Sequence, residues 1–117
     1  MSWLARIVEE RHGDVAVAAI LGEIDSSNVR EIASHAHAML TNRSEVLVFD
    51  LAQTTYIDSA GINMLFSLGD ELAQRQQGLH LVVDPSSPIA RMLSITGLDA
   101  AVATHPTRAQ ALAAVSS

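Results

Sequence analysis

The segment Val46-Leu47-Val48-Phe49-Asp50-Leu51 is a nearly continuous apolar run. Strands that are buried on both faces have this pattern, whereas a strand with one solvated face alternates apolar and polar residues. After a short stretch at 52–58, the apolar period becomes helical. One face of this helix carries Gly61, Met64, Leu65, Leu68 and Leu72. The segment therefore predicts a central strand that leads through a turn into an amphipathic helix beginning at Ser59.

Two further strands are expected before this unit. Residues 4–10 and 15–21 are rich in apolar and β-branched side chains, and the turn signal Arg11-His12-Gly13-Asp14 separates them. They predict a β-hairpin. A helix that ends at 41–44 is expected between this hairpin and the central strand. Its apolar face holds Val29, Ile32, Ala33, Ala36, Met39 and Leu40. The residues that could cap its start are Ser26, Ser27 and Asn28.

The chain after the Ser59 helix continues the alternation of strand and helix. Gly78 occupies the usual position for a helix terminator, and the apolar residues 79–84 predict the next strand. Pro88 suits the first position of a short helix that ends at Gly97.

The C-terminal part completes the fold prediction. Residues 98–103 are expected to form an edge strand, and the capping box Thr107-Arg108-Ala109-Gln110 opens a last helix that runs through Ala114. Strands that alternate with helices imply parallel pairing through right-handed crossovers. We therefore expect one α/β domain over residues 1–117. It would have a mixed sheet of about five strands, an N-terminal hairpin followed by β-α-β units, and about four helices packed on the sheet.

Composition narrows the class of function. The 117 residues include 13 acidic and 7 basic side chains, a net charge of −6, no Lys and no stripe of Arg. Binding to nucleic acid or attraction to an anionic membrane is therefore not expected. The N-terminus does not resemble a signal peptide, no apolar run approaches the ~20 residues of a membrane span, and there is no Cys. These features predict a cytoplasmic protein without membrane insertion.

Neither a catalytic centre nor a metal site is expected. Asp58-Ser59-Ala60-Gly61 is not the Gly-x-Ser-x-Gly nucleophile elbow, and the glycine patterns of phosphate and dinucleotide loops are absent. The five His do not have the spacing of metal ligands. A magnesium site at Glu23, Asp25 and Asp58 is conceivable, but such acids are more often caps and loop charges. The sequence thus predicts a protein that is not an enzyme and holds no cofactor.

Ser59 admits two interpretations. Ser59 or Asp58 could simply cap the helix. Alternatively, Ser59 is an exposed phosphorylation site, because a helix N-terminus has unpaired N–H groups and the positive end of the helix dipole, which tolerate a phosphate. Phosphorylation adds about −1.5 to −2 charges beside Asp58. A partner docked at this turn would be repelled while the fold survives.

The helix that begins at Ser59 could also offer an apolar docking surface. Ile62 and Phe66 lie one turn apart, off the core face that includes Leu65 and Leu68. They either pack under a neighbouring helix or, if exposed, form a patch beside Ser59 that suits a partner helix.

Four segments, residues 22–25, 46–61, 86–88 and 93–98, together resemble the STAS domain family, and within it the bacterial anti-sigma factor antagonists. Gly22-Glu23-Ile24-Asp25 is similar to the family's Gly-Glu-Leu-Asp element after the second strand. Residues 46–61 resemble its apolar strand followed by Asp-Ser-(Ser/Thr/Ala)-Gly. Residues 86–88 and 93–98 resemble its later loop and its helix that ends in Gly-Leu. The resemblance covers most of the chain.

The resemblance implies a protein that binds other proteins and regulates transcription, as in a stress response. The unmodified form would bind an anti-sigma factor that is also a serine kinase, and the sigma factor would be released. The kinase would then phosphorylate the antagonist with ATP, and a serine phosphatase would reset the cycle. This scheme implies that Ser59 is the acceptor, Asp58 its acidic neighbour and Asp25 a loop acid facing the partner. The residues expected to bind the partner are Gly22, Glu23, Asp25, Ser26, Asp58, Ser59, Ala60, Gly61, Ile62 and Phe66.

One departure from the family pattern keeps other functions open. Many antagonists have a second Ser or Thr where this chain has Ala60. Members with other partners resemble it here, so a non-enzymatic subunit of a lipid-transport ABC ATPase is an alternative. A scaffold subunit of a stress-signalling assembly is another, although such members usually carry an additional N-terminal domain. Whether the domain forms a homodimer is left open.

Overall fold

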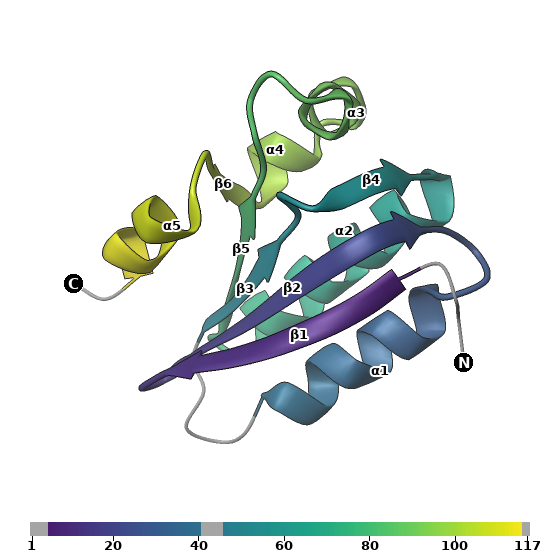
Figure 1. Cartoon of the computed structure of the whole chain (residues 1–117). Helices are drawn as coiled ribbons and strands as arrows, with labels where there is room; N and C mark the ends of the chain where they lie inside the picture. Colours follow the sequence, from purple (N-terminus) through teal and green to yellow (C-terminus); the bar gives the residue numbers. More distant parts are fainter. Residues whose placement is uncertain (1–4, 41–45, 116–117) are drawn as a thin grey trace.

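The computed structural model describes residues 5–40 and 46–115, and a mixed β-sheet forms its centre (Figure 1). Its strands are β1 (Ala5–His12), β2 (Val15–Ile24), β3 (Val46–Asp50), β4 (Thr54–Ile57), β5 (Gly78–Val82) and β6 (Ala103–His105). β1 and β2 pair antiparallel, whereas β3, β5 and β6 extend the sheet parallel to β2. The predicted α/β fold, with its hairpin and β-α-β units, is confirmed.

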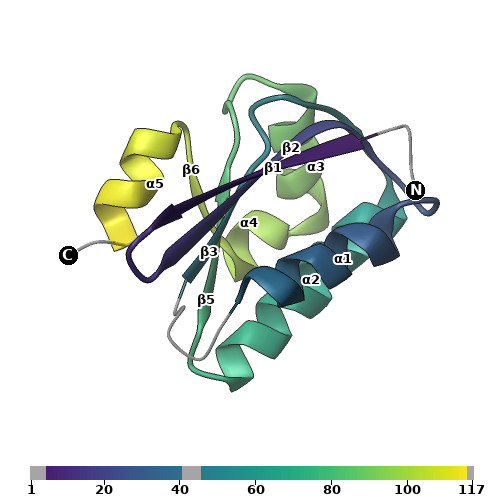
Figure 2. The same ribbon diagram turned by 60° about the horizontal axis from the view of Figure 1, so that its bottom comes forward.

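Helices cover both faces of this sheet. In the described residues they are α1 (Val29–Met39), α2 (Ser59–Gln74), α3 (Pro88–Thr96), α4 (Leu98–Ala101) and α5 (Arg108–Val115). α1 and α2 lie side by side against one face, and α5 packs on the other (Figure 2). The described chain thus has one strand and one helix more than expected.

The two-sided cover explains the continuous apolar run in the central strand. Leu47 and Phe49 of β3 belong to the large core cluster under α1 and α2, together with residues of β2 and β5. Val48, between them, points to the opposite face and packs in a second cluster with Val82 and with Ala111 of α5. Alternate residues of one strand therefore enter different cores, and neither position can be polar without a partner.

The unexpected strand is β4. Residues 52–58 were expected to connect β3 to α2 without a strand, but Thr54–Ile57 pairs in parallel with the end of β2. The pairing requires a register shift after Gly22, whose φ of 116° is accessible to glycine. The hydroxyl of Thr54 donates to the Ile20 carbonyl at 2.7 Å, which fixes the strand against its neighbour.

Two predictions in the later chain are wrong at their boundaries. Residues 98–103 do not form an edge strand: they begin with helix α4, in which Leu98 is fully buried, and β6 is only Ala103–His105. Gly78 does not terminate α2 but starts β5, and the left-handed residue after the helix is Gln76, with φ of 59°. The helix that runs from Pro88 to a left-handed Gly97 is confirmed. The turn expected at 41–44 lies outside the described residues.

An ion pair anchors α5 to the sheet. The carboxylate of Asp50, at the end of β3, is 8% exposed and accepts a hydrogen bond from Arg108 Nε at 2.8 Å. The same guanidinium donates to Glu10 on β1 at 2.7 Å. Burial by itself would lower the pKa of Arg108, but the hydrogen bond and charge of Asp50 raise it above its usual value. One side chain thus joins α5 to both a central and an edge strand.

We expect Arg108→Ala to lower the free energy of unfolding by about 1–3 kcal/mol, because the nearly buried Asp50 carboxylate would keep, among the described residues, only the Ala52 N–H as a partner. The control is Arg91→Ala, since Arg91 is exposed and should cost less than about 0.5 kcal/mol. Urea unfolding followed by circular dichroism measures both. Equal losses in the two variants would contradict an anchoring role for the ion pair.

Candidate functional site

Asp58 caps the N-terminus of α2. Its backbone is extended, with φ of −103° and ψ of −174°, and its Oδ1 accepts a hydrogen bond from the Gly61 N–H at 3.0 Å. This geometry satisfies one of the unpaired N–H groups at the helix start. Of the two residues expected to cap this helix, Asp58 is therefore the one that does so, and Ser59 occupies the first helical position.

The same carboxylate ties α2 to the loop between β2 and α1. Asp58 Oδ2 accepts a hydrogen bond from the Ser26 N–H at 3.2 Å, across 32 positions of sequence. The Asp58 N–H in turn donates to the Ile24 carbonyl at 3.2 Å. The sequence analysis placed Asp58 and Ser26 in one site but did not predict this link, because no sequence pattern marks a side chain that bonds to a distant backbone group.

Internal hydrogen bonds shape the β2–α1 loop. Asn28 is 1% exposed; its Oδ1 accepts from the Asp25 N–H at 2.9 Å and its Nδ2 donates to the Glu23 carbonyl at 2.8 Å. Asn28 occupies the N-cap position of α1, as one of the alternatives predicted, but its side chain makes no cap hydrogen bond to the helix. Asp25 Oδ1 instead accepts from the N–H and hydroxyl of Ser27. The acidic loop is thus held in one shape beside α2.

Gly61 is required by the close approach of α2 to the sheet. A Cβ at this position would lie 2.6 Å from Cγ1 of Ile57 and 2.9 Å from Cγ2 of Ile24. Both atoms branch directly from the Cβ of buried side chains and have little freedom to move. The glycine therefore lets the first turn of α2 sit directly on the ends of β2 and β4, which fixes the position of Ser59.

Ser59 is exposed at this corner. The described residues provide no hydrogen-bond partner for its hydroxyl, since Asp58 performs the capping. Ala60, next to it, is partly buried, and helix α2 contains no Lys or Arg in its sixteen residues. The corner thus presents an accessible hydroxyl at the positive end of a long helix, beside one carboxylate and without a basic side chain on the same helix.

The structure corrects one part of the expected site. Ile62 is 4% exposed and belongs to the core, so the alternative of an exposed Ile62–Phe66 patch is wrong. Phe66 is partly buried and packs against the same core. Tyr56 of β4, two residues before Asp58, is 49% exposed, and Ile95 of α3, a helix that packs against β4, is 74% exposed. The sequence analysis missed both.

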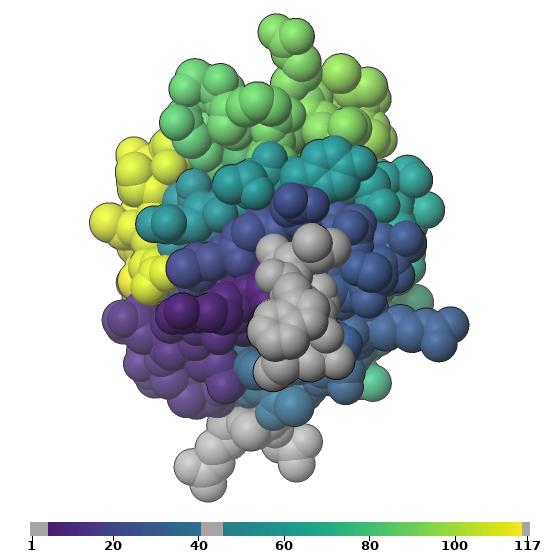
Figure 3. Space-filling model, turned by 45° about the vertical axis from the view of Figure 1, so that its right-hand side comes forward, coloured from purple at the N-terminus to yellow at the C-terminus, as the bar shows by residue number. Residues whose placement is uncertain are grey.

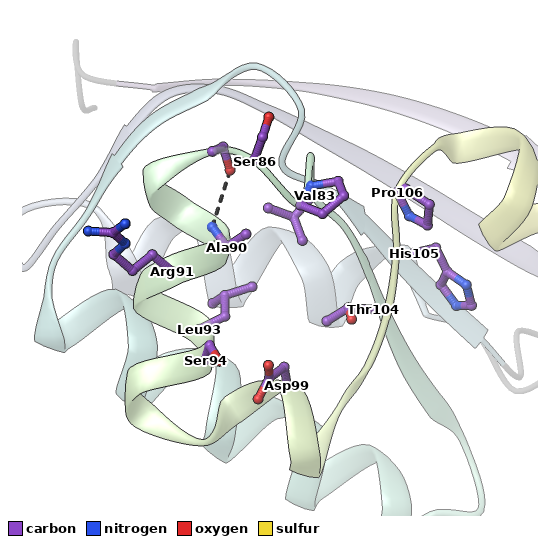
Figure 4. Close-up of a pocket in the computed structure, with 12 residues that line it drawn as sticks. Val83, Ser86, Ala90, Arg91, Leu93, Ser94, Asp99, Thr104, His105 and Pro106 are labelled. Atoms are coloured by element: carbon purple, nitrogen blue, oxygen red, sulfur yellow. Dashed lines mark hydrogen bonds between the residues drawn. The ribbon is translucent and has the colours of Figure 1, made fainter.

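Outside this corner, the described part of the chain has a cavity but no metal cluster and no candidate membrane span. In the described ranges, no three His, Asp or Glu side chains come together as a metal site would require. A cavity of about 570 Å³ lies between α3 and β6 (Figure 4). In that view the guanidinium of Arg91 points away from the cavity and Asp99 points toward it. None of the predicted site residues lines this cavity. Of the helices in residues 5–40 and 46–115, none is both long and apolar enough for a membrane span.

A model of the STAS domain family matches residues 6–111. The chain therefore belongs to the STAS domain family. Among its relatives, an anti-sigma-B factor antagonist of Listeria monocytogenes is 29% identical over 91 residues, which are 78% of this chain and 79% of the relative.

Solved structures share the fold. The crystal structure of an anti-sigma factor antagonist from Mycobacterium paratuberculosis has a TM-score of 0.85 and 27% identity, and the match covers 97% of this chain and 95% of that one. The phosphorylated form of SpoIIAA, a cell fate determinant of Bacillus, has a TM-score of 0.68 and 17% identity, with coverage of 94% and 99%.

We expect Gly61→Ala to destabilise the domain by about 1–3 kcal/mol, because the added methyl overpacks the contact with Ile57 and Ile24. The gain of up to ~1 kcal/mol in helix propensity offsets only part of this cost. The matched control is Gly78→Ala, where the nearest atom to a new Cβ is 3.7 Å away. Chemical denaturation of both variants tests the prediction, which would be wrong if Gly61→Ala were as stable as the wild type.

Proposed function

We propose that this chain is a cytoplasmic, non-catalytic anti-sigma factor antagonist whose binding is switched off by phosphorylation of Ser59. The unphosphorylated form binds an anti-sigma factor that is also a serine kinase, and the sigma factor is released. The kinase phosphorylates Ser59, and a serine phosphatase restores the binding form. The observation that carries the proposal is the exposed, uncommitted hydroxyl of Ser59 at the N-terminus of α2.

The relatives support this assignment. The Listeria protein and the Mycobacterium structure are both described as anti-sigma antagonists, and the match extends over most of each chain. SpoIIAA, which shares the fold, has been solved in both an unphosphorylated and a phosphorylated form. A fold that accommodates a phosphorylated form suits a switch in which charge, rather than unfolding, alters the surface.

The local geometry explains how a phosphate could change binding without unfolding the domain. Asp58 already caps α2 and bonds to the loop at Ser26, so the structure does not need the Ser59 hydroxyl. The phosphate would add about −1.5 to −2 charges beside the Asp58 carboxylate. With no basic side chain on α2 to neutralise it, a docked partner would have to desolvate this charge, which is costly.

Substitutions at Ser59 separate the effect of an added negative charge on binding from the effect of losing the hydroxyl. Ser59→Asp should fold normally but bind the anti-sigma factor kinase at least about tenfold more weakly, a loss of about 1.4 kcal/mol. Ser59→Ala should bind like the wild type and accept no phosphate from the kinase and ATP. The control is Ser67→Asp, an exposed serine on the same helix, which should leave binding unchanged. Calorimetry and mass spectrometry measure these outcomes; wild-type affinity of Ser59→Asp, or phosphate on another residue, would contradict the proposal.

The expected docking surface extends from Ser59 over β4 and α3. β4 leads directly into Asp58 and Ser59, and α3 packs against it. In Figure 3, β4 forms a band on the surface between β2 and α3. Tyr56 on β4 and Ile95 on α3 are the most exposed large apolar side chains of the described residues. Aromatic and apolar side chains of this kind often contribute most of an interface's binding energy.

We expect Tyr56→Ala to weaken binding of the kinase by at least about 1 kcal/mol, because an interface anchor would be lost. Val8→Ala is the matched control: Val8 is similarly exposed, at 44%, but lies on the edge strand β1 away from β4. Both variants should unfold at nearly the wild-type temperature. Equal affinities of the two variants would exclude Tyr56 from the interface.

Co-purification distinguishes this function from the alternative that Ala60 keeps open. Recovery of an anti-sigma factor kinase with the tagged chain would support the proposal. Recovery of an ABC ATPase instead, with no phosphate on Ser59, would favour a transport subunit and overturn it.

A further inference from the structure

Two histidines on neighbouring strands contact each other at the edge of the sheet far from Ser59 in sequence. Nδ1 of His80, on β5, lies 2.9 Å from Nε2 of His105, on β6. The ring planes are within 16° of each other and the ring centres are 5.1 Å apart. Because the nitrogens are much closer than the ring centres, the rings lie edge to edge, which is the arrangement of an N–H···N hydrogen bond.

The contact joins the last strand of the sheet, β6, to its neighbour β5. β6 has only three residues and pairs only with β5. The His105 carbonyl accepts a hydrogen bond from the Val83 N–H at 2.9 Å, just beyond the end of β5. Helix α5 begins three residues later and packs on β5 and β6. In Figure 4, the ring of His105 lies on the far side of β6 from α3.

We propose that His80 and His105 form a proton-sensitive clasp, which holds β6 and α5 to the sheet near neutral pH and opens in acid when both rings are charged. With no added proton or one, the pair retains an N–H between the two nitrogens. With two, both nitrogens carry hydrogen, so the bond is lost and two like charges face each other. The clasp does not depend on Ser59 or on any partner.

In the part of the chain that the structure describes, no carboxylate bonds to His80 or His105. On the sheet, Asp50 of β3 is bonded to Arg108 of α5, which also binds Glu10 of β1. Asp84, after β5, accepts the N–H and hydroxyl of Ser86. Across β6, Asp99 of α4 and Arg91 of α3 line the cavity on the side away from the His105 ring.

The titration of His80 agrees with this geometry. Burial, and then the charge of His105, lower the pKa of His80 from its ordinary value of 6.5. The folded state therefore disfavours the second proton. The contribution of the clasp is fully present above pH 6.5 and is lost as the pH falls from there through the lowered pKa of His80. The population of the opened form should grow by up to about tenfold per pH unit in that window.

An NMR titration that follows the imidazole resonances of the full chain tests whether the two histidine rings influence each other's protonation. The pKa of the His80 imidazole should lie below its ordinary value of 6.5 in the wild type, and it should rise in His105→Gln, where the charge of His105 is absent. The same pKa of His80 in the wild type and in His105→Gln would overturn the proposal.

Amide exchange tests the opening itself. The protection factor of the Val83 N–H, which bonds to His105, should fall about tenfold between pH 7.5 and 5.5, whereas that of Leu51, which bonds to Val82 at 2.8 Å, should not. His105→Gln keeps a hydrogen-bonding side chain that does not titrate and should abolish the pH effect. The control is His35→Gln, which should retain the pH effect. If His105→Gln does not fold, His80→Gln takes its place. The same pH response in wild type and in the clasp variant would overturn the proposal.

Discussion

The direct contact between the first turn of α2 and the ends of β2 and β4 is the constraint on which the site depends. Gly61 permits it, since any side chain there would meet Ile57 and Ile24 within 3 Å. Asp58 fixes it, with one carboxylate oxygen on the helix and the other on the loop at Ser26. Two segments 32 positions apart therefore meet at one corner, and packing and the Asp58 cap, not a hydrogen bond of the Ser59 hydroxyl, fix the location of Ser59.

This arrangement divides two roles between adjacent residues. Asp58 caps the helix N-terminus, which is the role that a serine often fills, so the hydroxyl of Ser59 does not serve as the cap. Under the proposed function, a charge added to Ser59 would therefore leave the cap of α2 in place. Had Ser59 been the cap, modification would have altered both stability and surface, and the two effects could not have been separated.

The sequence predicts those helices and strands that neighbouring residues determine. It misses the features that depend on contacts between residues far apart in the chain. The apolar run of β3 and the Pro88-to-Gly97 helix were predicted, because periodicity and backbone preference act within a few residues. β4 was missed because four residues with two exposed side chains gain their strand geometry only from β2. The bond from Ser26 to Asp58 and the His80–His105 contact join residues 32 and 25 positions apart, which no local pattern records.

The distribution of charge separates the two ends of the domain. The Arg108 ion pairs and the two partly buried histidines hold α5 and β6, so titratable groups contribute directly to the stability of that region. The corner at Ser59 is held mainly by close apolar packing and by backbone N–H groups that bond to one carboxylate. Arg108 is already paired with Asp50 and Glu10, and α2 itself carries no Lys or Arg. The two ends of the described chain are thus stabilised by different interactions, ion pairs at α5 and apolar packing with a carboxylate cap at α2.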